Sequence, residues 1–479
     1  MARAAPRPSP TTPADQAAGR LLGAIEDRLG EALERGRRTL VSATLEVESL
    51  DPGAVAFASR LASDRWFCWE QPDRERFAIA GIGSAWEIVS RGRDRFADAE
   101  AACAEMSRAR VATEPEDLPP GAGAIWAAGF AFAPHGGSAP RWSSFPPALV
   151  MMPELALARV GGSSYLTLAA VVSPGGSADE ISERLRARLA SLRHDPMPLL
   201  DPDPTRGTTI RSARPPGSYE AGIARATERI REGTLEKVVL AREVVVESPS
   251  AHDPAALYGA LRDLFPSCFC FCFGTPEAAF VGASPELLVR RSGAVAATAA
   301  LAGSTRRSAD PAVDDHLGEQ LMRSAKDRHE HEIVARRIER VLRPHAVWVE
   351  AASEPELVRV ANIQHLATPI HAQLTEPRSA LELAGLLHPT PAVGGEPREA
   401  ASTAIPELEE MDRGWYAGAL GWMDTAEDGE LCVGLRSALL RDREAHLYAG
   451  GGIVAESDPA AELAETEVKL QALLPLIAG

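Results

Sequence analysis

A lysine lies inside the most apolar strand that the sequence predicts. The segment LEKVVLAREVVVE alternates so that Lys237, Val239 and Ala241 share one face of this strand. Such a lysine usually lies at a sheet edge or extends its amine to solvent. If it is buried instead, desolvation lowers the pKa of the amine and makes it a candidate general base. The spacing alone favours the edge position and leaves both interpretations open.

A glutamate on a predicted helix faces the core. In the helix KDRHEHEIVARRIERVL, Glu330 shares a face with Val334 and Ile338. Its carboxylate must be paired or bound to a metal, because an isolated buried charge is too costly. The neighbouring His329 and His331 are two residues apart, so one helix face does not present both. We therefore do not expect a zinc site there.

The last predicted helix carries two more glutamates beside a lysine. Asp458 is its predicted N-cap and Pro459 its first residue. Glu462, Glu465 and Lys469 fall on one narrow face of this helix. A solvated row of ion pairs explains this pattern. A cation site explains it as well, and oxygen ligands would favour magnesium over zinc.

Two short segments, VGASPELLV and LYAGGGIV, interrupt predicted strands. Glu286 follows Ser-Pro in the first segment and, taken alone, is a turn carboxylate. Gly450, Gly451 and Gly452 form either a flexible turn or a backbone that closely approaches an anion. Neither a phosphate-binding loop with Lys-Ser/Thr, nor G-x-G-x-x-G, nor G-x-S-x-G is present. Kinase, nicotinamide-dependent and serine-hydrolase functions are therefore disfavoured.

Composition indicates a globular protein that binds neither nucleic acid nor membrane. The 479 residues are 45% hydrophobic and carry a net charge of −17, the wrong sign for binding nucleic acid. No apolar segment is long enough to span a membrane. Cys268, Cys270 and Cys272 alternate with phenylalanines, which predicts buried thiols on one strand face in a reducing compartment. Because no signal peptide is visible, we expect a cytoplasmic protein.

The chain divides at a proline-rich connector, residues 195–217. Residues 1–14 predict a disordered Pro/Thr/Ala-rich tail, residues 15–213 an N-terminal half and residues 214–479 a catalytic half. In the catalytic half, Ser218 is the predicted N-cap of a helix that runs to Gly233. Strand candidates interspersed with helices through both halves predict an α+β fold.

A series of segments resembles the chorismate-utilising enzymes, and more narrowly the isochorismate synthases of menaquinone and siderophore pathways. In chain order, these segments are KVVLAR, GASPELL, ALAGSTRR, KDRHEHE, HLATP, LHPTPAVGG, YAGALGW, GLRSALL and YAGGGIVAESDPAAELAETEVK. The resemblance extends from Ser218 to the C-terminus. It implies one large α+β domain, in which two antiparallel-rich sheets pack face to face, helices lie outside, and the active site occupies a cleft.

The resemblance implies a role for each matching residue. Lys237 corresponds to the base that deprotonates the water attacking C2 of chorismate, and Glu286 to the acid that protonates the departing C4 hydroxyl. Glu330 and Glu465 correspond to the ligands of Mg²⁺, with Glu462 as an outer neighbour. Arg436 and the Gly450 backbone correspond to the contacts of the enolpyruvyl carboxylate. Other matching substrate-site positions are Gly303, Ser304, His365, Ala392, Tyr416, Gly451 and Lys469.

Differences within the family favour one reaction. Relatives that use ammonia lack the lysine found here at Lys237, and salicylate synthases tend to carry threonine at the position of Ala392. We therefore expect an isochorismate synthase that acts as a monomer without an amidotransferase subunit. The alternatives are a salicylate synthase, which also eliminates pyruvate, and a catalytically silent scaffold protein.

Overall fold

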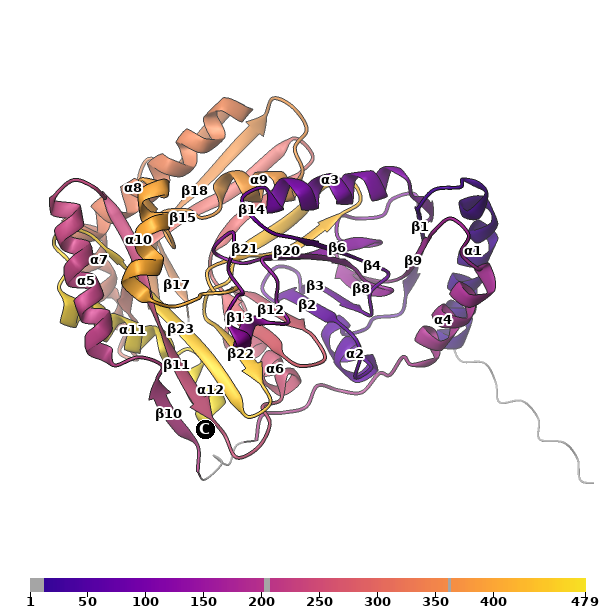
Figure 1. The fold of residues 1–479 in the computed structure, drawn as a ribbon, viewed down its shortest axis with the longest axis horizontal. Helices are drawn as coiled ribbons and strands as arrows, with labels where there is room; N and C mark the ends of the chain where they lie inside the picture. Colours follow the sequence, from indigo (N-terminus) through magenta and orange to yellow (C-terminus); the bar gives the residue numbers. More distant parts are fainter. Residues whose placement is uncertain (1–12, 202–206, 361–362) are drawn as a thin grey trace, which may run out of the picture.

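Two large β-sheets face each other, and helices cover their outer surfaces (Figure 1). This computed structural model describes residues 13–201, 207–360 and 363–479. Most of the predicted tail and part of the connector, residues 1–12 and 202–206, lie outside these ranges. The predicted single α+β domain is confirmed, since both halves of the chain contribute neighbouring strands to each sheet.

The larger sheet is antiparallel except where β1 pairs with β5. Its strand order is β10 (Thr209–Ser212), β11 (Lys237–Glu247), β23 (Glu444–Ile453), β22 (Ser437–Arg441), β13 (Ala279–Ser284), β12 (Phe269–Gly274), β2 (Trp66–Gln71), β3 (Phe77–Ile82), β8 (Leu155–Val160), β9 (Ser163–Val172), β1 (Thr39–Val47) and β5 (Val111–Thr113), with β19 (Gly395–Glu396) also paired to β11. The predicted alternation in β12 is confirmed, because its cysteines face the outer helices and its phenylalanines face the second sheet.

The smaller sheet is antiparallel throughout. Its order is β16 (Ala346–Ala351), β18 (Ile363–Leu374), β15 (Val295–Arg306), β14 (Leu287–Ser292), β21 (Gly429–Val433), β20 (Ala419–Asp424), β6 (Ile125–Phe130), β7 (Ala148–Met152) and β4 (Trp86–Ser90), with β17 (Glu356–Val360) also paired to β18. The strands of the N-terminal and C-terminal halves meet where β6 pairs with β20.

Helices pack on the outer face of each sheet. Those of the N-terminal half are α1 (Pro13–Glu34), α2 (Pro52–Ser59), α3 (Arg95–Arg108) and α4 (Ala178–Ala190). Those that follow are α5 (Pro216–Arg231), α6 (Pro254–Leu264), α7 (Pro311–Arg323), α8 (Ala325–Leu342), α9 (Ala380–Leu387), α10 (Arg398–Glu409), α11 (Pro459–Leu470) and α12 (Leu474–Ala478). Helices α8, α10 and α11 lie at the end of the molecule opposite to α1 and α4 (Figure 1). No helix of the described ranges is long and apolar enough to cross a membrane.

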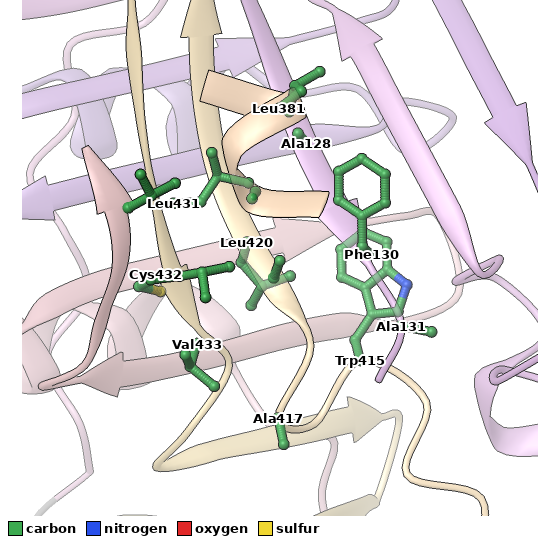
Figure 2. Packing of buried hydrophobic residues seen from close by; sticks show 14 of the residues in the cluster. Ala128, Phe130, Ala131, Leu381, Trp415, Ala417, Leu420, Leu431, Cys432 and Val433 are labelled. Atoms are coloured by element: carbon green, nitrogen blue, oxygen red, sulfur yellow. The ribbon is translucent and has the colours of Figure 1, made fainter. Parts of the chain in front are cut away.

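The space between the sheets is filled by large aromatic and aliphatic side chains. Figure 2 shows Trp415 and Phe130 beside Leu420, Leu431 and their neighbours in this core. The indole nitrogen of Trp415 donates a hydrogen bond to the carbonyl of Pro146 at 2.8 Å. A Cβ atom on Gly129 would lie 2.0 Å from the Trp415 ring, so only glycine fits there. This packing fixes the segment that continues into Tyr416.

Two local predictions differ from the structure, and the connector holds a strand that was not predicted. Helix α5 begins at Pro216 rather than after Ser218, because two consecutive prolines already fix the backbone for helix entry. Gly450–Gly452 lie inside β23, paired with β11, and do not form a turn. The connector also contains the short strand β10, which its prolines concealed.

Candidate active site

The predicted site residues meet at one cavity between the ends of the two sheets. The cavity is lined by Glu286, Gly303, Ser304, Glu330, His365, Ala392, Tyr416, Arg436, Gly450, Gly451, Glu465 and Lys469. Its walls come from β11, β15, β18 and β23 and from helices α8 and α11. The remaining two predicted residues, Lys237 and Glu462, lie directly behind this lining.

Lys237 is completely buried at the start of β11, with 0% of its surface exposed. This burial excludes the edge-residue interpretation. Its Nζ lies 2.9 Å from Oε1 of Glu330 in an ion pair, although the angle does not meet hydrogen-bond geometry. A Cβ on Gly452 of the paired strand would lie 3.0 Å from Cε of Lys237 and 1.9 Å from Oε1 of Glu330. The third glycine of β23 therefore makes room for this pair.

Glu286 is a buried carboxyl between β13 and β14. Its backbone N–H donates to Oγ of Ser284 at 3.2 Å, which holds the turn that aims the side chain into the cavity. Burial raises the pKa of Glu286 to about 8, although the nearby lysines Lys237 and Lys469 oppose this shift. The carboxyl is therefore protonated at neutral pH and can donate a proton.

The three remaining glutamates each contact a lysine. The Nζ–Oε1 distances are 2.9 Å for Lys237–Glu330, 2.8 Å for Lys326–Glu462 and 2.8 Å for Lys469–Glu465. Burial raises the pKa of Glu462, and the charge of Glu465 adds to this effect. The pKa of Glu465 itself is lowered: burial opposes the shift, but Lys469 and the Ser304 hydroxyl, which donates at 2.8 Å, outweigh it. The solvated-row interpretation fails for Glu462, which is only 2% exposed, whereas Glu465 and Lys469 form a partly exposed ion pair on this face.

Both helices that carry these acids begin at a side-chain cap, and the cap of α11 is the predicted one. The Asp458 side chain accepts a hydrogen bond from the N–H of Ala461 at 2.9 Å and caps α11. Ser324 caps α8 by accepting from the N–H of Asp327 at 3.3 Å. Each cap satisfies a free backbone N–H at the start of a helix that carries these glutamates.

The donor chemistry of this cluster fits magnesium. Its candidate ligands, Glu330, Glu465 and Glu462, offer carboxylate oxygens only, which Mg²⁺ prefers. Across the described residues, no three His, Cys, Asp or Glu side chains converge as a ready-made metal cage. His331, beside Glu330, is instead buried and hydrogen-bonds through Nε2 to the Thr368 hydroxyl at 2.7 Å, so its role is structural.

The cavity also presents an arginine with an unused donor. Arg436 Nη2 donates to Nε2 of His365 at 2.9 Å, whereas its buried Nη1 has no hydrogen-bond partner among the described residues. Burial, with the cations Arg436 and Lys469 nearby, lowers the pKa of His365 well below its usual value. The imidazole is therefore neutral and accepts from the arginine. The free Nη1 donor suits a ligand carboxylate.

The cavity also contains residues that the sequence analysis did not select. These are Lys326, Asp327, Arg413 and Tyr448, among others. Helical spacing offered a signal for Lys326 and Asp327, which lie one turn before Glu330. Strand alternation offered one for Tyr448, two residues before Gly450. For Arg413 no local pattern indicated a site.

Gly303 shows why β15 bends at the cavity. Its φ of 76° lies in the left-handed region, and the register of β15 against β18 shifts between Ala302 and Ser304. A Cβ at Gly303 would lie 3.1 Å from Cβ of Asp327. The bulge directs the Ser304 hydroxyl towards Glu465.

A family model described as chorismate binding enzyme matches residues 27–478. The chain belongs to the chorismate-binding enzyme family. The match includes the N-terminal half, beyond the segment from Ser218 in which the sequence motifs lie. The predicted family is therefore confirmed over nearly the whole chain.

Known members of this family resemble the chain along its length. The salicylate biosynthesis isochorismate synthase of Pseudomonas aeruginosa is 37% identical over 462 residues, which cover 96% of this chain and 95% of that protein. The isochorismate synthase MenF of Bacillus subtilis is 31% identical over 94% of this chain and 96% of its own length.

Solved structures confirm the fold. MenF, the menaquinone-specific isochorismate synthase of Escherichia coli, has a TM-score of 0.76 and 27% identity over 95% of this chain and 100% of its own. Anthranilate synthase component I of Streptococcus pneumoniae has a TM-score of 0.64 over 83% of this chain and 91% of its own. At 21% identity, the second likeness concerns the fold alone.

Proposed function

We propose that this protein is an isochorismate synthase, which converts chorismate to isochorismate. The observation that carries the proposal is the combination of a buried amine, Lys237, and a buried carboxyl, Glu286, that is protonated at neutral pH. Hydration at one ring carbon with loss of hydroxide from another needs one base and one acid. Relatives named isochorismate synthases, similar over nearly the whole chain, support the same reaction.

In this proposal Lys237 accepts a proton from water as the water oxygen bonds to C2. The ring double bonds shift, the C4–O bond breaks, and the Glu286 carboxyl gives its proton to the departing hydroxyl, which leaves as water. The two residues exchange roles for the reverse reaction. Because both side chains are buried, bulk water does not compete for these protons.

The substrate is a dianion, and the cavity offers cations for it. We assign the enolpyruvyl carboxylate to the free Nη1 of Arg436 and to the Gly450 backbone. Glu330 and Glu465, with Glu462 behind them, would hold Mg²⁺, which supplies positive charge for the ring carboxylate. Tyr416, His365, Ala392 and the other predicted residues would shape the remaining wall. Cytoplasmic location, a monomeric state and independence from an amidotransferase remain predictions.

Product analysis tests the proposal. The purified protein is incubated with chorismate and Mg²⁺, with and without an ammonium salt, and products are separated by chromatography beside a pyruvate assay. Isochorismate without pyruvate supports the proposal. Salicylate with equal pyruvate would favour the salicylate synthase, an ammonium-dependent amino product would overturn the role of Lys237, and no turnover by folded protein would favour the scaffold. If isochorismate is the product, we expect it to feed menaquinone or siderophore biosynthesis.

A further inference from the structure

One arginine at the cavity wall uses most of its guanidinium N–H groups for hydrogen bonds to other parts of the protein. Arg413 is 4% exposed, and its Nη1 donates to the carbonyl of Val393 at 2.8 Å. Its Nη2 donates to the carbonyl of Val239 at 2.9 Å. Its Nε donates to the Glu409 carboxylate at 3.0 Å, and its Cζ lies over the Phe132 ring, 4.1 Å from the ring centre. Four of the five N–H groups of Arg413 therefore donate to other groups of the protein.

The groups that Arg413 contacts belong to separate segments that carry site residues. Val239 lies two residues after Lys237 in β11, and Val393 directly follows Ala392 in the loop between α9 and β19. The backbone N–H of Tyr416 donates to the Arg413 carbonyl at 3.0 Å. Arg413 is thus hydrogen-bonded to the backbone two residues after Lys237, to the backbone directly after Ala392, and to the backbone of Tyr416.

Glu409 belongs to the same group of contacts around β11. Its Oε1 accepts a hydrogen bond from the N–H of Ala241 at 2.7 Å, so the acid holds β11 at a second point. Burial raises the pKa of Glu409, and the adjacent guanidinium opposes this. The buried pair is 4 residues apart, at the end of α10 and just after it. Phe132 adds a contact from the N-terminal half, of which no described residue lines the cavity.

We propose that Arg413 is a positioning residue for the isochorismate synthase reaction: it joins β11 to the Ala392 loop, which also pairs with β11 directly, since the Val239 N–H donates to the Gly394 carbonyl at 2.7 Å. This inference rests on the proposed function. A displacement of about 1 Å between reacting groups can cost about 100-fold in rate. Because Arg413 does not contact the proposed carboxylate-binding groups, its loss lowers kcat and leaves KM for chorismate nearly unchanged.

Chemical rescue distinguishes positioning from general stabilisation. Arg413→Ala is made with Glu409 retained, because this carboxylate is the anionic partner that a buried guanidinium ion requires. The empty space adjoins the cavity, because Arg413 lines it, and added guanidinium ion can enter. We expect kcat to fall about 100-fold with KM within about threefold. Guanidinium, at concentrations far below those that unfold proteins, restores kcat, whereas sodium chloride at equal ionic strength does not.

Arg95→Ala is the matched control. Arg95 is also 4% exposed, donates to the carbonyl of Ala131 at 3.0 Å and lies over a phenylalanine ring, but it does not line the cavity. It should lose stability without guanidinium rescue of kcat. The proposal would be overturned if the folded Arg413 variant had the kcat of the wild type. It would also be overturned if guanidinium did not restore kcat, or restored it equally in the Arg95 control. Failure of both this variant and Arg413→Lys to fold would overturn it as well. An inactive wild-type protein would instead overturn the proposed function.

Discussion

Replacing Glu286 with glutamine should remove catalysis while making the protein more stable at alkaline pH. The amide keeps the shape of the carboxyl but neither ionises nor donates an acidic proton. Burial raises the pKa of Glu286 from 4.5 to about 8 in the folded protein. The folded state therefore retains a proton that the unfolded chain releases between these pH values.

The sign and size of the effect follow from this retained proton. Because the native state binds more protons than the unfolded state, the free energy of unfolding of the wild type falls as pH rises through this window. A pKa rise from 4.5 to about 8 corresponds to about 5 kcal/mol once the buried carboxyl is fully ionised. Glu286→Gln escapes this loss, so its stability relative to wild type rises by up to that amount.

Urea unfolding at about pH 5 and about pH 9 measures the effect. The variant and wild type should have similar midpoints at the lower pH, and the variant should be clearly more stable at the higher pH. Glu247→Gln, an exposed glutamate at the end of β11, is the control and should follow the wild type at both values. If Glu286→Gln also follows the wild type, Glu286 is an ordinary ionised carboxylate and the acid assignment fails.

Four further substitutions test the other parts of the site. Lys237→Ala should lower kcat by at least about 100-fold with the fold retained by circular dichroism, because the base is lost. Glu330→Gln should chiefly weaken Mg²⁺ affinity, measured by calorimetry. Arg436→Lys should raise KM for chorismate about 10-fold in steady-state kinetics, because an ammonium lacks the guanidinium fork. Gly452→Ala should lower both activity and melting temperature, since its Cβ would lie 1.9 Å from the Glu330 carboxylate. Unchanged values in these assays would contradict the corresponding role.

The sequence was sufficient to predict local elements and the faces of its helices. Alternation in β12 predicted which side chains face the second sheet, and the caps of α11 predicted where this helix begins. The face shared by Glu330, Val334 and Ile338 is buried as expected. Each of these features depends on neighbours within one or two turns or strands, which a single sequence displays directly.

Long-range pairing limited the remaining predictions. Whether Lys237 lies at an edge or in the interior depends on β23 and β19, which come from far along the chain and cover β11. The glycines of β23 resembled a turn, because their need to admit Glu330 and Glu462 arises only when two helices pack on that strand. Arg413 was missed for the same reason, as its acceptors are carbonyl groups that carry no sequence signal.

Labelling the water oxygen tests the central claim most directly. The protein is incubated with chorismate and Mg²⁺ in H₂¹⁸O, and the product is examined by mass spectrometry beside a pyruvate assay. Attack by water at C2, activated by Lys237, predicts isochorismate that carries one ¹⁸O in its new hydroxyl group and no pyruvate. Unlabelled isochorismate would show that the hydroxyl migrated within the substrate, and salicylate with pyruvate would show a different reaction; either result would contradict the account.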